Sequence, residues 1–240
     1  MDIALLSGLN AERAARRACL VITDMGDHSQ RLVREAELVQ EPWTRDPLSS
    51  ALNEALRSGK SGLIETNGRS LFVNVQVPPV KLIVTGAVHI SQALQPMARE
   101  LNLDMTVIDP RTAFATPERF PDVRLIADWP DEALLTIPLD RYTAFVALTH
   151  DPKIDDPALE AALRSDCFYI GALGSRKTHA KRVERLKAAG VNDADIGRIR
   201  APIGLNIGAV SPAEIALAIV GEIVSVLRAE RVAAKAALVS

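Results

Sequence analysis

Polar side chains that could bind a ligand follow four short apolar segments, each typical of a buried strand. The segments are Lys81–Thr85, Met105–Asp109, Thr143–Thr149 and Phe168–Gly171. Ligands of open α/β sheets bind outside the carboxyl ends of the strands, so we expect one ligand site at this edge. The candidate binding residues are Gly86, Ala87, Val88, His89, Asp109, Arg111, Thr149, His150, Asp151, Gly171, Gly174, Ser175, Arg176, Lys177 and His179. Three of the four histidines belong to this set, which favours a shared ligand over scattered surface histidines.

The stretch KLIVTGAVHISQAL, Lys81–Leu94, is typical of the start of a dinucleotide-binding unit. In the fingerprint G-x-G-x-x-G, the second glycine lets the backbone approach a pyrophosphate. This sequence keeps Gly86 but has Val88 at the second position and Ser91 at the third. A β-branched side chain at the second position argues against a pyrophosphate there.

Asp109 and Arg111 each have two open interpretations. Asp109 follows Gly86 at roughly the 20-residue spacing of an acidic residue that binds a ribose hydroxyl. It could equally cap the turn before Pro110. Arg111 could bind a phosphate or pair with a neighbouring carboxylate.

The segment GALGSRKTHAKRVERLKAAG, residues 171–190, carries the clearest binding signal. Two glycines bracket a tight turn from strand to helix, and we expect Ser175 to cap the helix. Free backbone N–H groups and the helix dipole favour an anion at its first turn, Arg176 to His179. Cations there oppose the dipole by about 0.3–1 kcal/mol each, so an anionic ligand is the natural compensation. The basic run continues with Lys181, Arg182, Arg185 and Lys187, which we expect to form a solvated face.

The elements that position these residues alternate between strands and helices after Val80. A further strand is predicted at Val123–Ala127, and helices at His89–Leu101, Asp156–Arg164 and Arg176–Ala189. This alternation indicates a parallel sheet covered on both faces. A last helix begins with a capping box, in which Ser211 is the N-cap and Glu214 lies at N3. An apolar stripe follows at Ile215, Ile219, Ile223 and Leu227.

The first 78 residues are predicted to form a small mixed unit. They contain a strand at Cys19–Thr23, a helix that closes at Gly59, and a hairpin. The hairpin turn is Asn67-Gly68, the dipeptide that a type I′ turn prefers. Pro78-Pro79 then marks a plausible boundary.

Composition excludes several classes of protein. The chain has 240 residues, 48% of them hydrophobic, and a formal net charge of −2, which gives no electrostatic case for nucleic acid. No apolar run approaches the roughly 18 residues of a membrane span, and the N-terminus has its apolar patch before its charges, the reverse of a signal peptide. Cys19 and Cys167 are too few for a disulfide framework or a structural zinc site, which is typical of a cytoplasmic protein. We expect no metal ligands and no catalytic nucleophile–base pair, since hydrolase and P-loop motifs do not occur.

Two long segments of the sequence resemble the C-terminal domain of the XdhC/CoxI family. They are FYIGALGSRKTHAKRVERL (Phe168–Leu186) and APIGLNIGAVSPAEIALAIVGEIV (Ala201–Val224). TGAVH (Thr85–His89), VIDPR (Val107–Arg111), FATPERFP (Phe114–Pro121) and LTHD (Leu148–Asp151) resemble it as well, in the expected order. The resemblance runs from about Val80 to Arg228 and implies an α/β fold. That fold is a Rossmann-like parallel-sheet domain at 79–240 with a small N-terminal α+β domain at 1–78.

The resemblance also implies a role in enzyme maturation. Proteins of this family are accessory factors for molybdenum hydroxylases such as xanthine dehydrogenase, aldehyde oxidoreductase and carbon monoxide dehydrogenase. They bind molybdenum cofactor (molybdopterin), hold it while a cysteine desulfurase adds sulfur, and pass it to the apo-enzyme. Such proteins commonly form homodimers. The cofactor is anionic, which agrees with the helix terminus at Gly174–His179.

The sequence departs from longer family members in its first 78 residues. Those members carry a G-S-x-P-R-like and a G-G-G-x-x-E-like motif, and neither occurs here. The usual G-A-G-H also becomes Gly86-Ala87-Val88-His89. Two other hypotheses stay open at this point: an NAD(P)-dependent oxidoreductase with His150 or His179 as acid/base, and a protein-interaction component without a small ligand.

Overall fold

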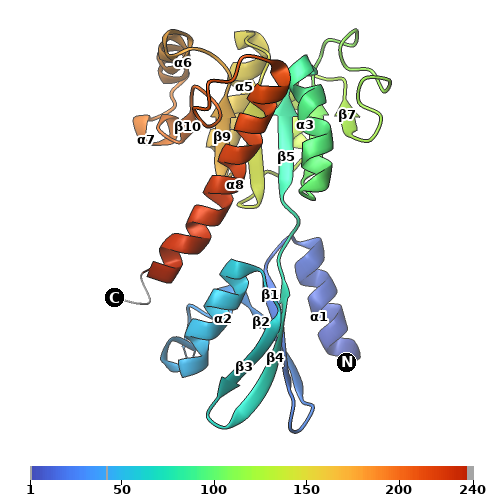
Figure 1. Cartoon of the computed structure of the whole chain (residues 1–240), viewed down its shortest axis with the longest axis vertical. Coiled ribbons are helices and arrows are strands. Elements are labelled where there is room, and N and C mark those ends of the chain that lie inside the picture. Colours follow the sequence, from blue (N-terminus) through green and yellow to red (C-terminus); the bar gives the residue numbers. More distant parts are fainter. Residues whose placement is uncertain (1, 42, 237–240) are drawn as a thin grey trace. The chain divides into compact units, whose positions relative to one another are not determined.

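The chain divides into two compact units. The computed structural model describes residues 2–41 and 43–236. The first unit contains the chain up to Pro78 and also the segment that begins at Ala229, and the second is Pro79–Arg228 (Figure 1). Within the described ranges, no helix is both long enough and apolar enough to span a bilayer.

A six-stranded parallel sheet forms the centre of the second unit. Its strands are β5 (Lys81–Thr85), β6 (Asp104–Ile108), β7 (Arg124–Ile126), β8 (Thr143–Ala147), β9 (Tyr169–Ala172) and β10 (Ile199–Arg200). They lie in the order β10-β9-β8-β5-β6-β7. Read from β7 to β10, this is the order 3-2-1-4-5-6 of the Rossmann fold, so the predicted fold class is confirmed. The strand order reverses between β5 and β8, which makes their carboxyl ends the topological switch point.

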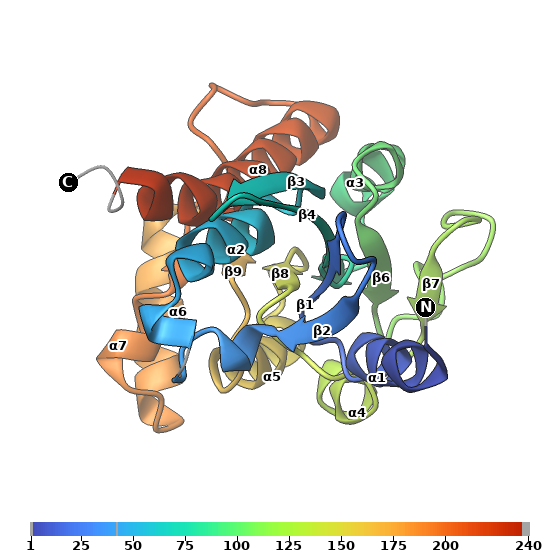
Figure 2. The same ribbon diagram turned by 90° about the horizontal axis from the view of Figure 1, so that it is seen from below.

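Helices cover both faces of this sheet. They are α3 (His89–Glu100), α4 (Pro130–Leu135), α5 (Pro152–Leu163), α6 (Arg176–Ala188), α7 (Asp193–Ile196) and α8 (Pro212–Ala236). Side chains alternate between the faces: Leu82 and Val84 pack with α3 and α8, whereas Ile83 packs with α4, α5 and α6. Figure 2 shows α3 and α8 on one side of the strands and α4 and α5 on the other. The near-continuous apolar runs of the central strands follow from this two-sided burial.

The helix starts follow local capping signals. Ser175 Oγ accepts from Thr178 N at 3.2 Å at the start of α6, as predicted. The capping box of α8 is confirmed, since Glu214 N donates to Ser211 Oγ and Ser211 N donates to the Glu214 carboxylate. Helix α5 begins at Pro152 rather than at the predicted Asp156, because Asp151 caps it by accepting from Lys153 N at 2.9 Å.

The first unit is a four-stranded antiparallel sheet with two α-helices. Its strands β1 (Cys19–Asp24), β2 (Gln30–Arg34), β3 (Gly62–Thr66) and β4 (Arg69–Gln76) lie in the order β2-β1-β4-β3. Its helices are α1 (Ile3–Ala14) and α2 (Pro47–Ser58), and short 3₁₀ turns lie at Glu35–Glu37 and Trp43–Arg45.

Two local features stabilise this unit. Asn67 and Gly68 have φ values of 49° and 72°, which confirms the predicted type I′ turn. Glu12, with a side chain only 3% exposed, accepts from Arg17 at 2.6 Å and from Arg34 at 2.8 Å. These hydrogen bonds lower the pKa of Glu12 to about 2.

Candidate functional site

The turn after β5 lies at the switch point and requires a glycine. Gly86 has a φ of 113°, and a Cβ there would lie 2.9 Å from Thr149 Cγ2. Gly86 N donates to Ile108 O at 2.8 Å, which joins the ends of β5 and β6. The glycine therefore serves a close approach between protein segments.

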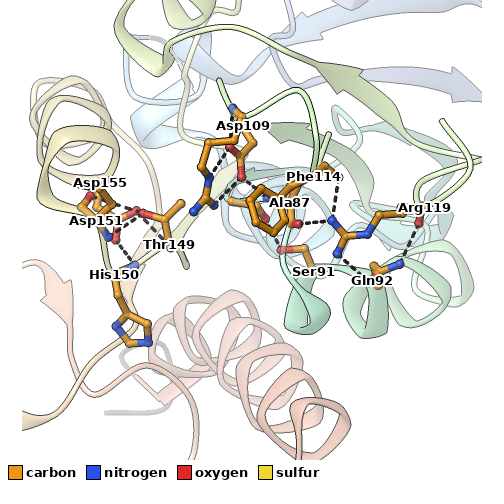
Figure 3. Close-up of polar contacts among 12 residues, drawn as sticks. Ala87, Ser91, Gln92, Asp109, Phe114, Arg119, Thr149, His150, Asp151 and Asp155 are labelled. Carbon is orange, nitrogen blue, oxygen red and sulfur yellow. Dashed lines mark hydrogen bonds and ion pairs between the residues drawn. The ribbon is translucent and has the colours of Figure 1, made fainter. Parts of the chain in front are cut away.

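Asp109 joins the β5–α3 turn to the loop after β6. Its carboxylate is fully buried and accepts from Ala87 N at 2.7 Å. It also accepts from Arg111 N and Nε at 2.9 Å and from Arg111 Nη2 at 2.7 Å (Figure 3). Burial opposes ionisation, but the hydrogen bonds from Arg111 and Ala87 outweigh it and lower the pKa of Asp109 below its usual value. Of the two interpretations left open for each residue, Asp109 caps the turn before Pro110, and Arg111 pairs with a neighbouring carboxylate.

The loop after β6 also covers the β5–α3 turn. Arg119 Nη1 donates to Ala87 O at 2.9 Å and to Phe114 O at 2.8 Å, and Arg119 Nη2 donates to Gln92 Oε1 at 2.9 Å. Ser91 Oγ donates to Gly86 O. Both backbone polar groups of Ala87 are thus bound by other side chains, as Figure 3 shows. At a dinucleotide fingerprint, the pyrophosphate lies directly against the backbone of this turn. Here a pyrophosphate would first have to displace these contacts.

The turn after β8 is held by a buried carboxylate. Asp155 is 1% exposed and accepts from Thr149 Oγ1 at 2.7 Å and from His150 N at 3.1 Å. Burial outweighs these hydrogen bonds and raises the pKa of Asp155 above its usual value. His150 adopts a φ of 62°, and its imidazole points away from the cluster around Asp155 (Figure 3). His150 is exposed and is the residue of this turn that lines the larger cavity described next.

A cavity of about 530 Å³ adjoins the ends of β9 and β10. Its lining comes from the β9–α6 turn, from Pro202–Ala209 (here the glycine loop), from α8 and from His150. Four predicted site residues line it: His150, Gly174, Ser175 and Arg176. This volume lies within the roughly 300–1,000 Å³ of small-molecule pockets.

The first turn of α6 borders this cavity. Gly174 has a φ of 136°, and a Cβ there would lie 3.1 Å from Thr178 Cβ. The Arg176 side chain is exposed, so it is available to an anion beside the helix N-terminus. His179 is partly buried, and burial together with nearby Arg182 lowers its pKa below the usual value, which keeps the imidazole neutral at pH 7.

The glycine loop supplies site residues that were missing from the predicted set. Gly204 has a φ of 92°, and a Cβ there would lie 3.0 Å from the Ala218 backbone of α8. Glu222 of α8 holds the loop, because its carboxylate accepts from Gly204 N at 2.9 Å and from Tyr169 Oη at 2.6 Å. The sequence carries a signal here, because IGLNIG combines two glycines with the apolar residues Leu205 and Ile207. In the structure these two side chains are 43% and 51% exposed.

The remaining predicted residues lie outside this cavity. Gly171 is a buried strand residue, where a Cβ would lie 2.5 Å from Ile203 Cδ1. Lys177 lines a second, smaller cavity. The predicted solvated face is wrong for Arg182, which is 2% exposed because it turns inward and donates from Nη2 to Leu173 O at 2.9 Å. The switch-point residues Gly86, Ala87, Val88, His89, Asp109, Arg111, Thr149 and Asp151 form a separate group.

Comparison with known proteins places most of the second unit in a known protein family. Residues 82–223 match the family described as the XdhC Rossmann domain. A relative from Escherichia coli (strain K12), named molybdenum cofactor insertion chaperone PaoD, is 30% identical over 149 residues, which are 62% of this chain and 41% of that protein. A relative from Bacillus subtilis (strain 168), named as a probable xanthine dehydrogenase subunit, is 31% identical over 156 residues, which are 65% of this chain and 45% of that protein. The chain thus matches less than half the length of these relatives.

A solved structure shares the fold. It is a crystal structure from Bacillus halodurans named as a xanthine dehydrogenase, with a TM-score of 0.67 and 21% identity. The match covers 95% of this chain and 66% of that one.

Proposed function

The chain belongs to the family of proteins with the XdhC Rossmann domain, and from this premise we propose that it is an accessory protein of a molybdenum hydroxylase. In this proposal it binds molybdenum cofactor as cargo in the cavity beside the glycine loop. It holds the cofactor during sulfuration by a cysteine desulfurase and passes it to the apo-enzyme. The name of the Escherichia coli relative, a molybdenum cofactor insertion chaperone, supports this role.

The observation that carries the proposal is the chemistry of the cavity. A phosphorylated pterin needs a cation or helix N-terminus for its phosphate and an apolar wall for its planar ring. Arg176 and the start of α6 provide the first. The exposed apolar side chains Leu205 and Ile207 provide the second. The residues fit such a ligand, and a carrier needs no catalytic nucleophile.

We assign different tasks to the two groups of predicted residues. His150, Gly174, Ser175 and Arg176 would contact the cargo together with the glycine loop. Lys177 and His179 belong to the same helix turn and add positive charge and a neutral imidazole beside it. The switch-point group around Asp109 would position the turns without direct contact, since Asp109, Arg111 and Thr149 are already engaged with other protein groups.

The contacts at the switch point argue against the NAD(P) hypothesis. The Asp109 carboxylate would have to leave Arg111 to bind a ribose, and the Ala87 backbone would have to leave Asp109 and Arg119 to bind a pyrophosphate. In the same proposal, the first 78 residues act as a reduced N-terminal domain. The protein also forms a homodimer, as other family members commonly do.

A retention experiment tests the proposal. Purified protein is mixed with molybdenum cofactor and gel-filtered, and molybdenum and pterin fluorescence are measured in the protein fraction. We expect the wild type to retain both. Arg176→Gln should bind the cofactor at least about tenfold more weakly and retain correspondingly less, because a charge-assisted contact contributes about 1.5–3 kcal/mol. The matched control is Arg99→Gln, an exposed arginine at the end of α3 that is remote from the cavity in the sequence. Co-elution of neither molybdenum nor pterin with the wild type would contradict the proposal, and NAD tested in the same way should not be retained.

A further inference from the structure

A second cavity of about 320 Å³ lies between α5 and α6. It is lined by four cationic side chains, Lys177, Lys181, Arg182 and Arg185, and by two carboxylates, Asp155 and Asp156. His150 lines this cavity as well as the larger one, so the two cavities adjoin at that residue.

The two carboxylates are already engaged by the protein. Asp155 accepts from Thr149 and from the backbone N–H of His150. Asp156 pairs with Arg185, whose Nη2 donates to it at 3.1 Å. Within the described ranges, no carboxylate forms an ion pair with the other three cations, Lys177, Lys181 and Arg182. With four cations and two carboxylates, the lining of the cavity carries a net positive charge.

Arg182 is the decisive residue of this cavity. It is 2% exposed, and among the described residues only Leu173 O accepts a hydrogen bond from it, from Nη2 at 2.9 Å. Its Nε and Nη1 are buried, and no described residue accepts a hydrogen bond from either. A guanidinium stays charged in proteins. The carboxylates of Asp155 and Asp156 favour the charge of Arg182 electrostatically, but neither accepts a hydrogen bond from its buried Nε or Nη1. Buried donors left unpaired in this way call for an acceptor that binds from outside.

The spacing of the other cations points in the same direction. Lys177, Lys181 and Arg185 follow one another at four-residue intervals on α6, so like charges are neighbours on one helix face. Such neighbours repel unless an anion lies between them. The planar, forked guanidinium of Arg182 matches the oxygens of a phosphate group better than it matches a monovalent ion.

We propose that this cavity is a second anion site that takes a phosphate group, either a phosphate monoester or a pyrophosphate. Arg182 donates from its buried floor, and the exposed Lys177 and Lys181 hold the anion at its rim. The site does not depend on the identity of the ligand in the larger cavity. The phosphate comes from a ligand that extends past His150, or from a separate small anion.

Nuclear magnetic resonance of the whole chain tests the site directly. The Nε–H signal of Arg182 is followed while inorganic phosphate or pyrophosphate is added at constant ionic strength. We expect a saturable shift of this signal with both anions. In Lys177→Gln/Lys181→Gln, affinity for pyrophosphate should fall about tenfold, roughly 1.4 kcal/mol of binding free energy.

The control variant is Lys153→Gln/Lys187→Gln, which removes the same charge from exposed lysines that line neither cavity. Its affinity should stay within about twofold of the wild type, because surface charges act weakly at a distance. The proposal is overturned if the Arg182 signal shows no saturable shift at millimolar phosphate and pyrophosphate. It is equally overturned if both double variants lose affinity to the same extent.

A competition experiment identifies the source of the phosphate. If purified molybdenum cofactor displaces pyrophosphate, the site holds a phosphate of the ligand in the larger cavity. If the two bind together, the site holds a separate anion. A failure of cofactor retention would leave the phosphate titration unaffected, so the two proposals fail separately.

Discussion

Asp109→Asn should destabilise the second unit by about 3 kcal/mol. The wild-type carboxylate is fully buried and accepts four hydrogen bonds of 2.7–2.9 Å from Ala87 and Arg111. Asparagine keeps one acceptor oxygen and turns an NH₂ group toward donors, so at least two of those bonds are lost. Removal of one partner of a buried ion pair costs about 3–5 kcal/mol. The Arg111 side chain is 34% exposed, and water can solvate part of its freed charge, which places the expected loss at the lower end.

Urea denaturation measures this loss. The chain has two tryptophans, so a Trp43→Phe background leaves Trp129 as the fluorescent reporter of the second unit. Circular dichroism in parallel shows whether the two units unfold together, which decides whether a single free energy of unfolding applies. Asp104→Asn is the matched control, since Asp104 is an exposed residue at the opposite end of the same strand.

The result that would refute this reasoning is a loss of stability below about 0.5 kcal/mol, the size of an ordinary surface effect. A loss equal to that of Asp104→Asn would have the same meaning. Either outcome would show that the Asp109–Arg111 contact does not hold the switch-point turns. The assignment of a positioning role to Asp109 would then have to be withdrawn.

Three further variants test other parts of the chain. Glu222→Gln should lower stability by about 1–2 kcal/mol and weaken cofactor retention, because the bonds from Tyr169 and Gly204 that hold the glycine loop lose a charged acceptor; unchanged retention in the gel-filtration assay would contradict this. Gly86→Ala should lower the melting temperature through a loss of about 1–3 kcal/mol, since its φ of 113° is unfavourable for a Cβ; an unchanged melting temperature would be the contrary result. The pKa of Glu12 falls from 4.5 to about 2 on folding, so its stabilisation is complete above pH 4.5 and is lost as the pH falls toward 2. In Glu12→Gln, the acid-induced loss of stability over that range should be smaller, as urea titrations at successive pH values would reveal.

Local signals predict the scaffold of the site well. The capping residues Ser175 and Ser211 lie where the sequence places them, because an N-cap acts within three or four residues of the chain. The Asn67-Gly68 turn is predictable for the same reason. The short α4 and the two-residue β10 were missed, since elements of that length carry too few residues for a period to emerge.

The sequence alone could not decide the role of Asp109 or which basic residues of α6 are buried, because both depend on contacts between segments that are distant in the chain. The spacing of Asp109 suits a ribose ligand and a turn cap equally, and only its three-dimensional contact with Ala87 distinguishes them. The basic run of α6 is similarly ambiguous, because composition does not tell which side of a helix packs inward. Arg182 therefore looks like its exposed neighbours until the fold buries it.

The switch point and the cavity together explain why this Rossmann unit lacks a dinucleotide fingerprint. At β5, the carbonyl and N–H of Ala87 are satisfied by Arg119 and Asp109, so that turn has no free backbone to offer. At β9, the Gly174 turn opens onto a helix whose first N–H groups lack intrahelical partners and onto a large cavity. An anion at the second turn would meet the exposed Arg176 and the first backbone N–H groups of α6, of which Thr178 N is already held by Ser175 Oγ. In the proposed function the anion binds at the second turn, so the first turn has no need of a glycine in place of Val88 for a close backbone approach.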